Sequence, residues 1–527
     1  MSIEKIINLT ASELAQKIAK KEFSVQEVIE AHIKRIEEVD KQLNAVCVPL
    51  FEEARSYAFK ADKDIAEGKT VGPLHGVPIT IKEQFAVAGT ETNLGVPNQR
   101  GKKTNKDGPL VARLRQAGAI ILGKTNVMMT LAGWESDNPV YGRTNNPWDL
   151  NRSPGGSSGG ECAIIAARGS PWGLGGDFGG SIRLPAHFCG LHGLKPTSGR
   201  LTNADIPSHL FSSGLETIIG QPGPIARSVA DLKLMMEVLA NPPMKRTPDL
   251  IPPVPWPDPE KVSVKKLKIG IYTDNGVFSV SPAIQRAVEE SAAALREKGA
   301  LIKQFTFPEE EISWKLFLEV NSAGGTESLP RQLAGSDPND ILKDSVKGFT
   351  LPRLIRWILV FLMNRRGQKF LASTIRLVKT RSSEEYWQLV ERINNYRERF
   401  LKALEKNNID IILCPASAIV APLHGTTRYL LPPPMSYSIL FNLLGMPAGV
   451  VSVTRVKEDE EEDISRKVSK DRAVRTAWEV EKDSVGLPVG VQVVGWHWRE
   501  DIVLKVMEVL EEHFKTNDTY PINQKLL

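Results

Sequence analysis

The sequence of 527 residues has few cysteines and no long apolar run. Its 4 cysteines lie far apart, which excludes a dense disulfide framework and the paired spacing of cysteine metal sites. No apolar run reaches the ~18 residues that a membrane-spanning helix needs. The first residues lack the basic and apolar regions of a signal peptide. These absences predict a cytoplasmic protein with reduced thiols and no transmembrane helix.

Acidic residues are missing from one segment, between Asp344 and Glu384, which holds nine lysines and arginines. The net charge of the whole chain is +5, so the remainder is mildly acidic. Basic charge that is confined to one segment argues against a general nucleic-acid-binding protein. It indicates a local basic patch.

Short apolar runs alternate with helical patterns along the chain, and this alternation predicts an α/β fold in one large domain. A capping-box pattern at residues 10–13 begins the first helices, and an acidic run at 457–463 is expected to be a solvated loop. The expected strands are 77–81, 119–122, 267–272, 409–413, 449–453 and 486–496, and later helices are expected at 283–298 and 501–514.

Residues 118–125 match the pattern of a phosphate-binding P-loop. That loop must be open, so that its N–H groups face a phosphate, but the residues between the glycines are alanine, isoleucine, isoleucine and leucine. We therefore interpret this match as a buried strand followed by a turn.

Residues 155–159 match the nucleophile elbow of α/β-hydrolases, which requires a buried strand immediately before it. Residues 145–154 are instead polar and turn-prone, which argues against a hydrolase triad with a downstream histidine. No histidine in that part of the chain has a distinctive setting, so we interpret them as packing or surface residues: His187, His192, His209, His424 and His497.

Two glycine–serine loops and one lysine are the remaining candidates for a site. Ser181 follows two adjacent glycines, whose uncovered N–H groups can bind an oxyanion, and Ser157 lies in a similar loop. Lys82 ends an apolar run, where burial would lower its pKa and allow a neutral amine to act as a base. Taken alone, each loop also fits an ordinary tight turn.

With their flanking segments, these residues resemble the amidase signature family. The likeness is carried by residues 72–82, 123–126, 146–148, 155–160, 179–183 and 189–197. It implies one domain over residues 1–527, with a central twisted mixed sheet covered by helices on both faces. The serine–serine–lysine core would occupy about residues 71–220. The resemblance implies no cofactor and no metal.

The same resemblance implies a role for each candidate. Ser181 would be the nucleophile that forms the acyl-enzyme, Ser157 a bridging serine held by a cis peptide bond, and Lys82 the general base and acid. One departure is Gly176, which stands where the family usually has threonine or serine. That departure puts one hydrogen bond of the loop in doubt.

Supporting positions follow from the same likeness. The resemblance implies an oxyanion hole from the backbone N–H groups of Phe178, Gly179, Gly180 and Ser181. It also implies leaving-group contacts from the Leu131 carbonyl and the Ser157 hydroxyl, and a loop braced by Asp177 and Arg183.

The basic segment contains a strongly apolar stretch at residues 354–363, flanked by Arg353, Arg365 and Arg366. It is too short to span a bilayer, and its mixture of apolar and basic residues is typical of a helix lying on an anionic membrane surface. The alternative is a buried core helix with a basic solvent edge.

Within the family, this region and the C-terminal part resemble the fatty acid amide hydrolases. The likeness is carried by residues 381–389, 396–397, 436–437, 440–442, 447–451 and 484–489. It implies a lipid-like amide substrate and peripheral or monotopic membrane association through a cap at about 345–383, and it leaves a homodimer open. Ala132 stands where an aromatic residue is expected, and Trp134 is positioned to refill that space, so the acyl-chain preference stays open.

Three other functions compete with this hypothesis. One is the A subunit of a glutamyl-tRNA amidotransferase, whose polar substrate fits poorly with the apolar stretch at 354–363. The second is a general small-molecule amidase. The third is a non-catalytic membrane-binding protein with this fold, which the intact Lys82, Ser157 and Ser181 argue against.

Overall fold

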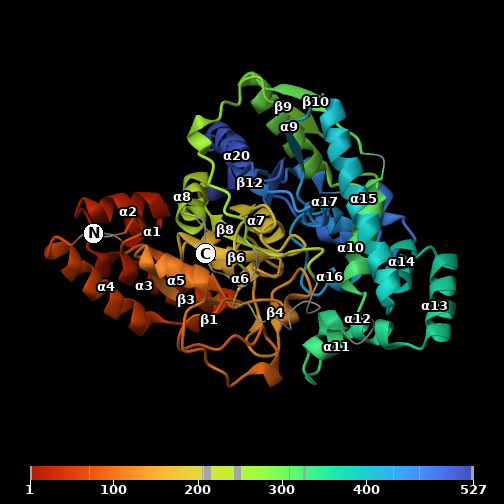
Figure 1. Ribbon diagram of the computed structural model, residues 1–527, viewed down its shortest axis with the longest axis horizontal. Coiled ribbons are helices and arrows are strands. Elements are labelled where there is room, and N and C mark those ends of the chain that lie inside the picture. Colours follow the sequence, from red (N-terminus) through yellow and green to blue (C-terminus); the bar gives the residue numbers. More distant parts are fainter. Residues whose placement is uncertain are drawn as a thin grey trace.

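The structure is a computed structural model that describes residues 3–69, 72–204, 206, 215–242, 251–307, 309–324, 328–430, 432–461, 463–523 and 527. Within these residues, one 11-stranded sheet runs through the molecule in the order β1-β3-β2-β6-β8-β7-β12-β13-β11-β9-β10 (Figure 1). Parallel pairs lie toward both ends, and the middle of the sheet is antiparallel. The predicted α/β fold with a mixed sheet is confirmed.

The strands have the following bounds: β1 Val46–Pro49, β2 Pro78–Lys82, β3 Ile120–Thr125, β6 Trp172–Asp177, β7 His192–Lys195, β8 Gln221–Ala226, β9 Lys268–Ile271, β10 Leu301–Gln304, β11 Ile411–Pro415, β12 Ala448–Arg455 and β13 Pro488–Gly495, with a separate small pair, β4 Asp137–Asn138 and β5 Gly142–Arg143. All six predicted strands are present. Analysis of the sequence missed β6 and β8, which are rich in glycine and proline. They are strands because they pair with each other along their whole length inside the core, and this pairing overrides their low strand propensity.

The helices have the following bounds: α1 Ile3–Ile7, α2 Ala11–Ala19, α3 Val25–Leu43, α4 Phe51–Ala66, α5 Pro109–Gln116, α6 Gly159–Ala166, α7 Arg183–Cys189, α8 Val229–Ala240, α9 Pro282–Glu297, α10 Glu310–Asn321, α11 Ser328–Gln332, α12 Asp340–Thr350, α13 Arg353–Arg365, α14 Lys369–Leu377, α15 Ser383–Asn407, α16 Thr427–Leu430, α17 Pro432–Leu443, α18 Ile464–Lys467, α19 Arg472–Glu481 and α20 Glu500–Phe514. Short 3-10 turns are η1 Pro97–Gln99, η2 Met129–Leu131, η4 Pro259–Lys261, η5 Glu458–Glu460 and η6 Pro521–Asn523. The predicted capping box is present, with Thr10 and Glu13 each bonding the other's backbone N–H at the start of α2.

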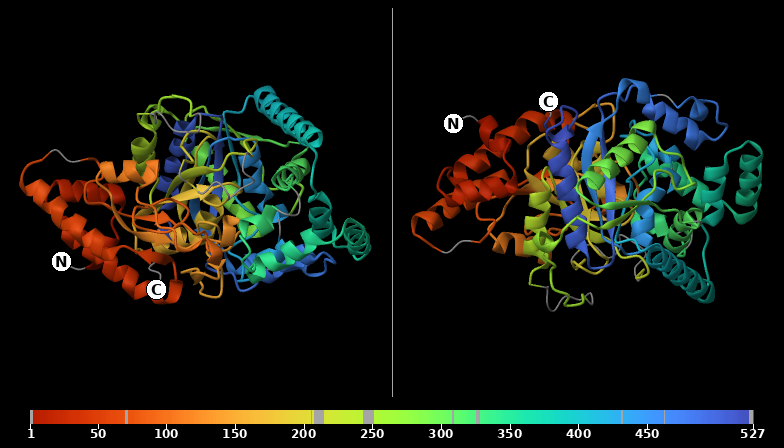
Figure 2. Two further views of the ribbon diagram at one scale, coloured as in Figure 1. Left: turned by 60° about the horizontal axis from the view of Figure 1, so that its bottom comes forward. Right: turned by 90° about the horizontal axis from the view of Figure 1, so that it is seen from above.

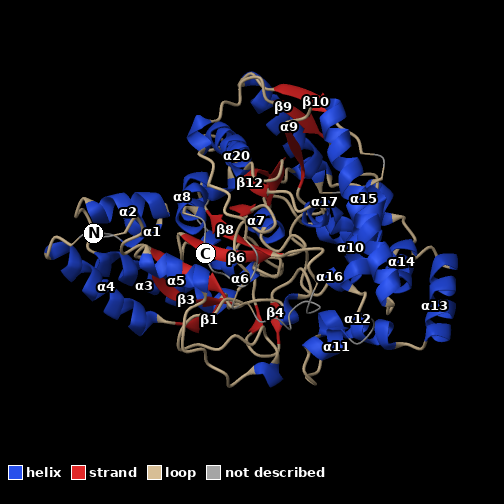
Figure 3. Cartoon of the chain, viewed as in Figure 1, coloured by secondary structure: helices blue, strands red, loops and turns tan. Residues whose placement is uncertain are grey.

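The strands lie in the middle of the molecule, with helices around them (Figure 3). Helices α6 and α7 pack together against the sheet, and α8, α9 and α20 form a second packed group against it. Helices α1–α4 lie at one end of the molecule and α11–α14 at the other, and the further views agree on this separation (Figure 2).

Residues 457–459 of the acidic run at 457–463 are exposed, as expected of a solvated loop, but Glu460 is only 7% exposed. Its carboxylate lies 2.9 Å from the guanidinium of Arg286 on α9. Because this ion pair neutralises the carboxylate, the charge can be buried.

Helix α13 contains the apolar stretch of the basic segment and lies at the edge of the molecule (Figure 1). Leu354, Trp357, Ile358 and Phe361 recur at helical spacing, and Trp357 is 66% exposed. The alternative of a buried core helix is therefore wrong. In the described part of the chain, no helix is long and apolar enough to cross a membrane.

Candidate active site

Lys82 and Ser157 meet at the centre of the molecule. Lys82 is the last residue of β2, and its amine nitrogen lies 2.8 Å from the Ser157 hydroxyl oxygen and 3.1 Å from the Gly176 carbonyl oxygen. Ser157 follows a cis peptide bond to Gly156 in the loop before α6. The structure thus brings together two of the three residues that the sequence singled out for proton transfer.

Burial controls the protonation of this lysine. The Lys82 side chain is fully buried, and desolvation lowers its pKa from 10.5 to about 7, although Asp177 and other nearby groups favour the charged form. A lysine with this pKa is largely neutral at slightly alkaline pH. It can therefore accept a proton from the neighbouring hydroxyl.

Ser181 lies in the tight turn that joins β6 to α7. Gly180 has φ +104°, a conformation that a residue with a β-carbon rarely adopts, and Ser181 follows it with 7% of its surface exposed. The two glycine–serine loops are held side by side, because the Ser158 N–H donates to the Ser181 carbonyl at 3.3 Å. This contact brings the third candidate residue next to the loop of Ser157.

The N–H groups of the turn around Ser181 differ in their hydrogen bonds. The Gly180 N–H, expected in an oxyanion hole, donates to the Asp177 carboxylate at 2.8 Å. The N–H groups of Gly179 and Ser181 have no hydrogen-bond partner among the described residues. Since an oxyanion hole needs donors that are not already used, Gly179 and Ser181 meet this requirement and Gly180 does not.

Asp177 and Arg183 form a buried ion pair beneath this turn, with 2.9 Å between Nε and Oδ2. Burial alone would raise the pKa of Asp177, but the Arg183 guanidinium and hydrogen bonds from Arg183 and Asn442 lower it below its usual range. Arg183 also donates to Asn442 and Gln492, each at 2.6 Å. This network ties the turn to α17 and β13, so both charged residues lie where they brace the loop.

Trp134 lies beside the turn, and Leu131 lies three residues before it in the chain. Leu131 ends η2 with φ +58°, an uncommon conformation for leucine. The Trp134 indole N–H donates to the Gly179 carbonyl at 3.1 Å. The Phe317 ring on α10 lies 3.1 Å from the position that a β-carbon on Gly179 would take. Two aromatic side chains therefore border the loop of Ser181.

Sequence reasoning missed a buried carboxylate near Lys82. Glu161 on α6 accepts hydrogen bonds from the hydroxyls of Thr80 and Thr125, and desolvation raises its pKa to about 7. An acidic residue inside an otherwise apolar helix was the available signal. A lone glutamine between the valines of β13 was the corresponding signal for Gln492.

The motifs that were set aside have structural roles. The P-loop match contains β3, and the Lys124 amine donates to the Glu91 carbonyl at 2.5 Å, so the strand interpretation is confirmed. His187 is buried between two backbone carbonyls, and desolvation lowers its pKa to about 4. His192, His424 and His497 also hydrogen-bond to protein groups, and His209 lies outside the described residues.

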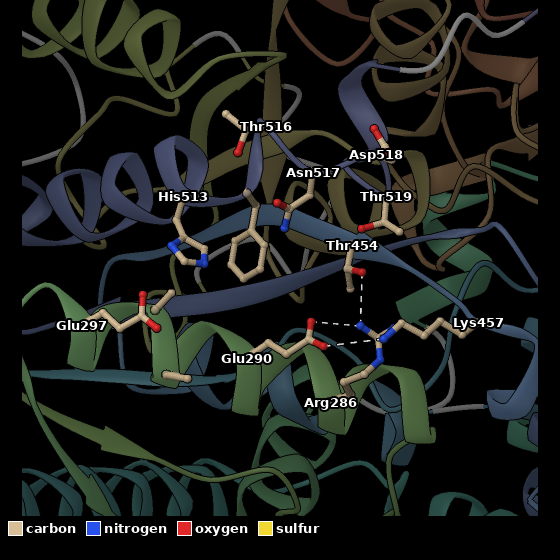
Figure 4. Close-up of a pocket in the computed structure, with 13 residues that line it drawn as sticks. Arg286, Glu290, Glu297, Thr454, Lys457, His513, Thr516, Asn517, Asp518 and Thr519 are labelled. Carbon is tan, nitrogen blue, oxygen red and sulfur yellow. Dashed lines mark hydrogen bonds and ion pairs between the residues drawn. The ribbon is translucent and has the colours of Figure 1, made fainter.

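A separate polar hollow of about 670 Å³ lies between α9, β12 and the C-terminal end of α20 (Figure 4). None of the candidate site residues lines it. Its Arg286 is paired with Glu290 at 3.0 Å, so the charges there neutralise one another. No group of three or more potential metal ligands was found in the described part of the chain.

Known proteins of one family resemble this chain over most of its length. A family model described as Amidase matches residues 27–504. The chain is 31% identical to fatty-acid amide hydrolase 1 of Sus scrofa, with 96% of this chain and 86% of the relative covered. It is 33% identical to an acetamidase of Aspergillus oryzae, with 96% and 89% covered. A solved structure of a fatty acid amide hydrolase superposes with a TM-score of 0.84 at 28% identity, covering 100% of this chain and 87% of that one.

Proposed function

Because this chain belongs to the amidase family and is an amide-hydrolysing enzyme related to fatty acid amide hydrolases, we propose that it cleaves fatty acid amides through an acyl-enzyme on Ser181. One observation carries the mechanism. A buried lysine with a pKa of about 7 lies 2.8 Å from a serine hydroxyl, next to a second serine loop with unused N–H groups.

The first half of the reaction forms the acyl-enzyme. Neutral Lys82 takes the hydroxyl proton of Ser157, which takes that of Ser181, while the Ser181 oxygen bonds to the amide carbon. The N–H groups of Gly179 and Ser181 stabilise the negative charge that develops on the carbonyl oxygen. The carbon–nitrogen bond then breaks as the proton returns from Lys82, through Ser157, to the leaving nitrogen.

The second half releases the acid. A water molecule gives a proton to Lys82 through Ser157 and attacks the acyl carbon. The ester bond then breaks as that proton returns through Ser157 to the Ser181 oxygen, which restores the serine hydroxyl and the neutral lysine. Asp177 and Arg183 take no proton in this scheme. Their ion pair keeps the turn in the shape that presents the hydroxyl and the N–H groups together.

Three observations support a lipid-like acyl chain. The relatives include proteins named fatty acid amide hydrolase in two comparisons. Trp134 and Phe317 provide apolar surface beside the Ser181 loop. The exposed apolar face of α13 suits contact with the lipid phase that holds such substrates.

We expect kcat/KM to rise with acyl-chain length across N-acylethanolamines from two to sixteen carbons, measured below their critical micelle concentrations. Each buried CH₂ contributes ~0.8 kcal/mol, so the increase should be up to about fourfold per carbon until the pocket is filled. The shared ethanolamine leaving group is the internal control. A flat profile contradicts the fatty-amide assignment.

A general small-molecule amidase is the second candidate function, since the acetamidase is as similar in sequence as the fatty-acid amide hydrolase. The same substrate series separates the two. Hydrolysis of the two-carbon substrate at least as fast as the sixteen-carbon one assigns the chain to small amides. The proposed chemistry of Lys82, Ser157 and Ser181 is unchanged in that case.

We also propose that α13 is the surface that meets an anionic membrane. The double variant Trp357→Ser/Phe361→Ser is expected to bind phosphatidylserine-containing vesicles at least tenfold more weakly than the parent protein in cosedimentation. The reason is that each large apolar side chain contributes about 1.5–3 kcal/mol on burial. Hydrolysis of a soluble ester should not change.

The matched control is Phe59→Ser on α4, which removes a 64% exposed phenylalanine at the opposite end of the molecule. It is expected to bind vesicles as the parent protein does. Equal binding by the α13 double variant and the parent protein overturns the membrane proposal.

A further inference from the structure

Gly176 presents a peptide group that touches the catalytic machinery on two sides. Its carbonyl accepts a hydrogen bond from the Lys82 amine at 3.1 Å and one from the Ser158 hydroxyl at 3.3 Å. Its N–H donates to the same hydroxyl at 3.4 Å. The position of this peptide therefore sets the position of the Lys82 amine.

The space for a side chain at position 176 is already filled. A β-carbon there would lie 2.6 Å from Nε2, 2.8 Å from Oε1 and 3.0 Å from Cδ of Gln84. The first two distances are shorter than real β-carbon contacts, so a side chain at this position would have to displace the carboxamide of Gln84.

Gln84 is held against Gly176 by a tight turn. The Phe85 N–H donates to the Lys82 carbonyl at 3.1 Å, and Glu83 accepts the N–H groups of Asn93 and Leu94. Gln84 is only 6% exposed, and its carboxamide makes no hydrogen bond to another described residue. Close packing against Gly176 is thus the contact that orients the carboxamide.

We propose that Gln84 is a positioning residue for the lysine. Its carboxamide replaces the missing side chain at position 176 and holds the Gly176 peptide, whose carbonyl anchors the Lys82 amine. Gln84 and Gly176 therefore depend on each other: glycine at position 176 of β6 leaves a space, and the long side chain on the turn after β2 fills it. This inference rests on the proposed role of Lys82.

A double-mutant cycle tests the unit with the full-length enzyme. Gln84→Ala is expected to lower kcat for amide hydrolysis about tenfold and to leave KM within about twofold, because the lysine and not substrate binding is disturbed. Gly176→Ser displaces the carboxamide and should cause a similar loss. The double variant Gln84→Ala/Gly176→Ser should return to within about threefold of the parent kcat, because the serine fills the space that the alanine leaves.

An isosteric variant reports on the lysine itself. Gln84→Glu places a carboxylate beside Lys82, which Asp177, Glu161, Glu83 and Cys162 already face. A negative charge favours the ammonium form, so the acidic limb of the kcat/KM profile should move up by about one pH unit. This shift tests whether the side chain at position 84 lies within electrostatic reach of the Lys82 amine, and the double-mutant cycle tests whether Gln84 positions that amine.

Gln285→Ala, at an exposed position on α9, is the matched control and should leave kcat unchanged. The inference is overturned if the double variant is no more active than the single variants, or if the limb stays in place in Gln84→Glu. Thermal melts identify a variant that fails to fold, and the split between kcat and KM in the folded single variant then decides. If the proposed function itself is wrong, the result is different, because Lys82→Ala would then hydrolyse the amide at the parent rate.

Discussion

Replacing Ser181 by alanine is expected to lower kcat for amide hydrolysis roughly 10⁴- to 10⁶-fold, the loss seen when a serine nucleophile is removed from a hydrolase. The reason is covalent chemistry. Without the Ser181 hydroxyl no acyl-enzyme forms, and the Gly179 and Ser181 N–H groups can only assist direct attack by water. A fluorophosphonate probe, which reacts with activated serines, should label the parent protein and not this variant.

The Ser181→Ala variant needs a control for folding. Ser170→Ala removes another buried hydroxyl, one that donates to the Trp172 carbonyl at 2.7 Å at the start of β6. This control should keep its labelling and most of its activity. Undiminished amide hydrolysis by Ser181→Ala contradicts the acyl-enzyme mechanism and leaves a non-catalytic or differently built site to be considered.

Replacing Lys82 by alanine is expected to lower the rate on an amide about 10³-fold more than the rate on an activated ester of the same acid. An amine leaves poorly unless it is protonated, and the proton that reaches it comes from Lys82 through Ser157. The alcohol of an activated ester leaves without that proton. Equal losses on the two substrates contradict the role of Lys82 as acid.

The dependence of kcat/KM on pH is a second measurement that tests the role of Lys82. Desolvation lowers the Lys82 pKa to about 7, and only the neutral amine accepts a proton. Below that pH, kcat/KM should therefore fall tenfold for each unit, and above it the profile should level off. In Lys82→Ala, the residual ester hydrolysis should lack this limb.

A second buried lysine provides the matched control. Desolvation also lowers the pKa of Lys195 to about 7, and its amine donates to the Pro196 carbonyl at 2.7 Å. Lys195→Met should keep the acidic limb of the profile. If Lys195→Met loses the acidic limb and Lys82→Ala keeps it, the titrating group is Lys195. That outcome contradicts our scheme.

Three interior strands of the C-terminal half could be predicted because their signals are local. Strands β11, β12 and β13 are runs of valine and isoleucine buried on both faces, and such runs have few other stable arrangements. The glycine-rich β6 could not be predicted in this way. Its strand conformation depends on pairing with β8, which is distant in the chain.

The residues of the site also divide into those that the sequence could predict and those that it could not. Lys82, Ser157 and Ser181 could be singled out because they and their flanking segments together resemble one family, whereas each glycine–serine loop alone also fits a tight turn. The partners of these residues carry no such signal. Asn442 and Gln492 reach the Arg183 guanidinium from α17 and β13.

By itself, the sequence determined the fold class, the three residues that we propose for the proton path and the apolar character of α13, since each signal lies in a short stretch of chain. Only the tertiary structure decided that Asp177 accepts a hydrogen bond from the Gly180 N–H, that Gln84 fills the space beside Gly176, and that α13 is exposed. Hydrogen bonding, close packing and exposure are properties of segments brought together by folding. No local pattern of residue types specifies them.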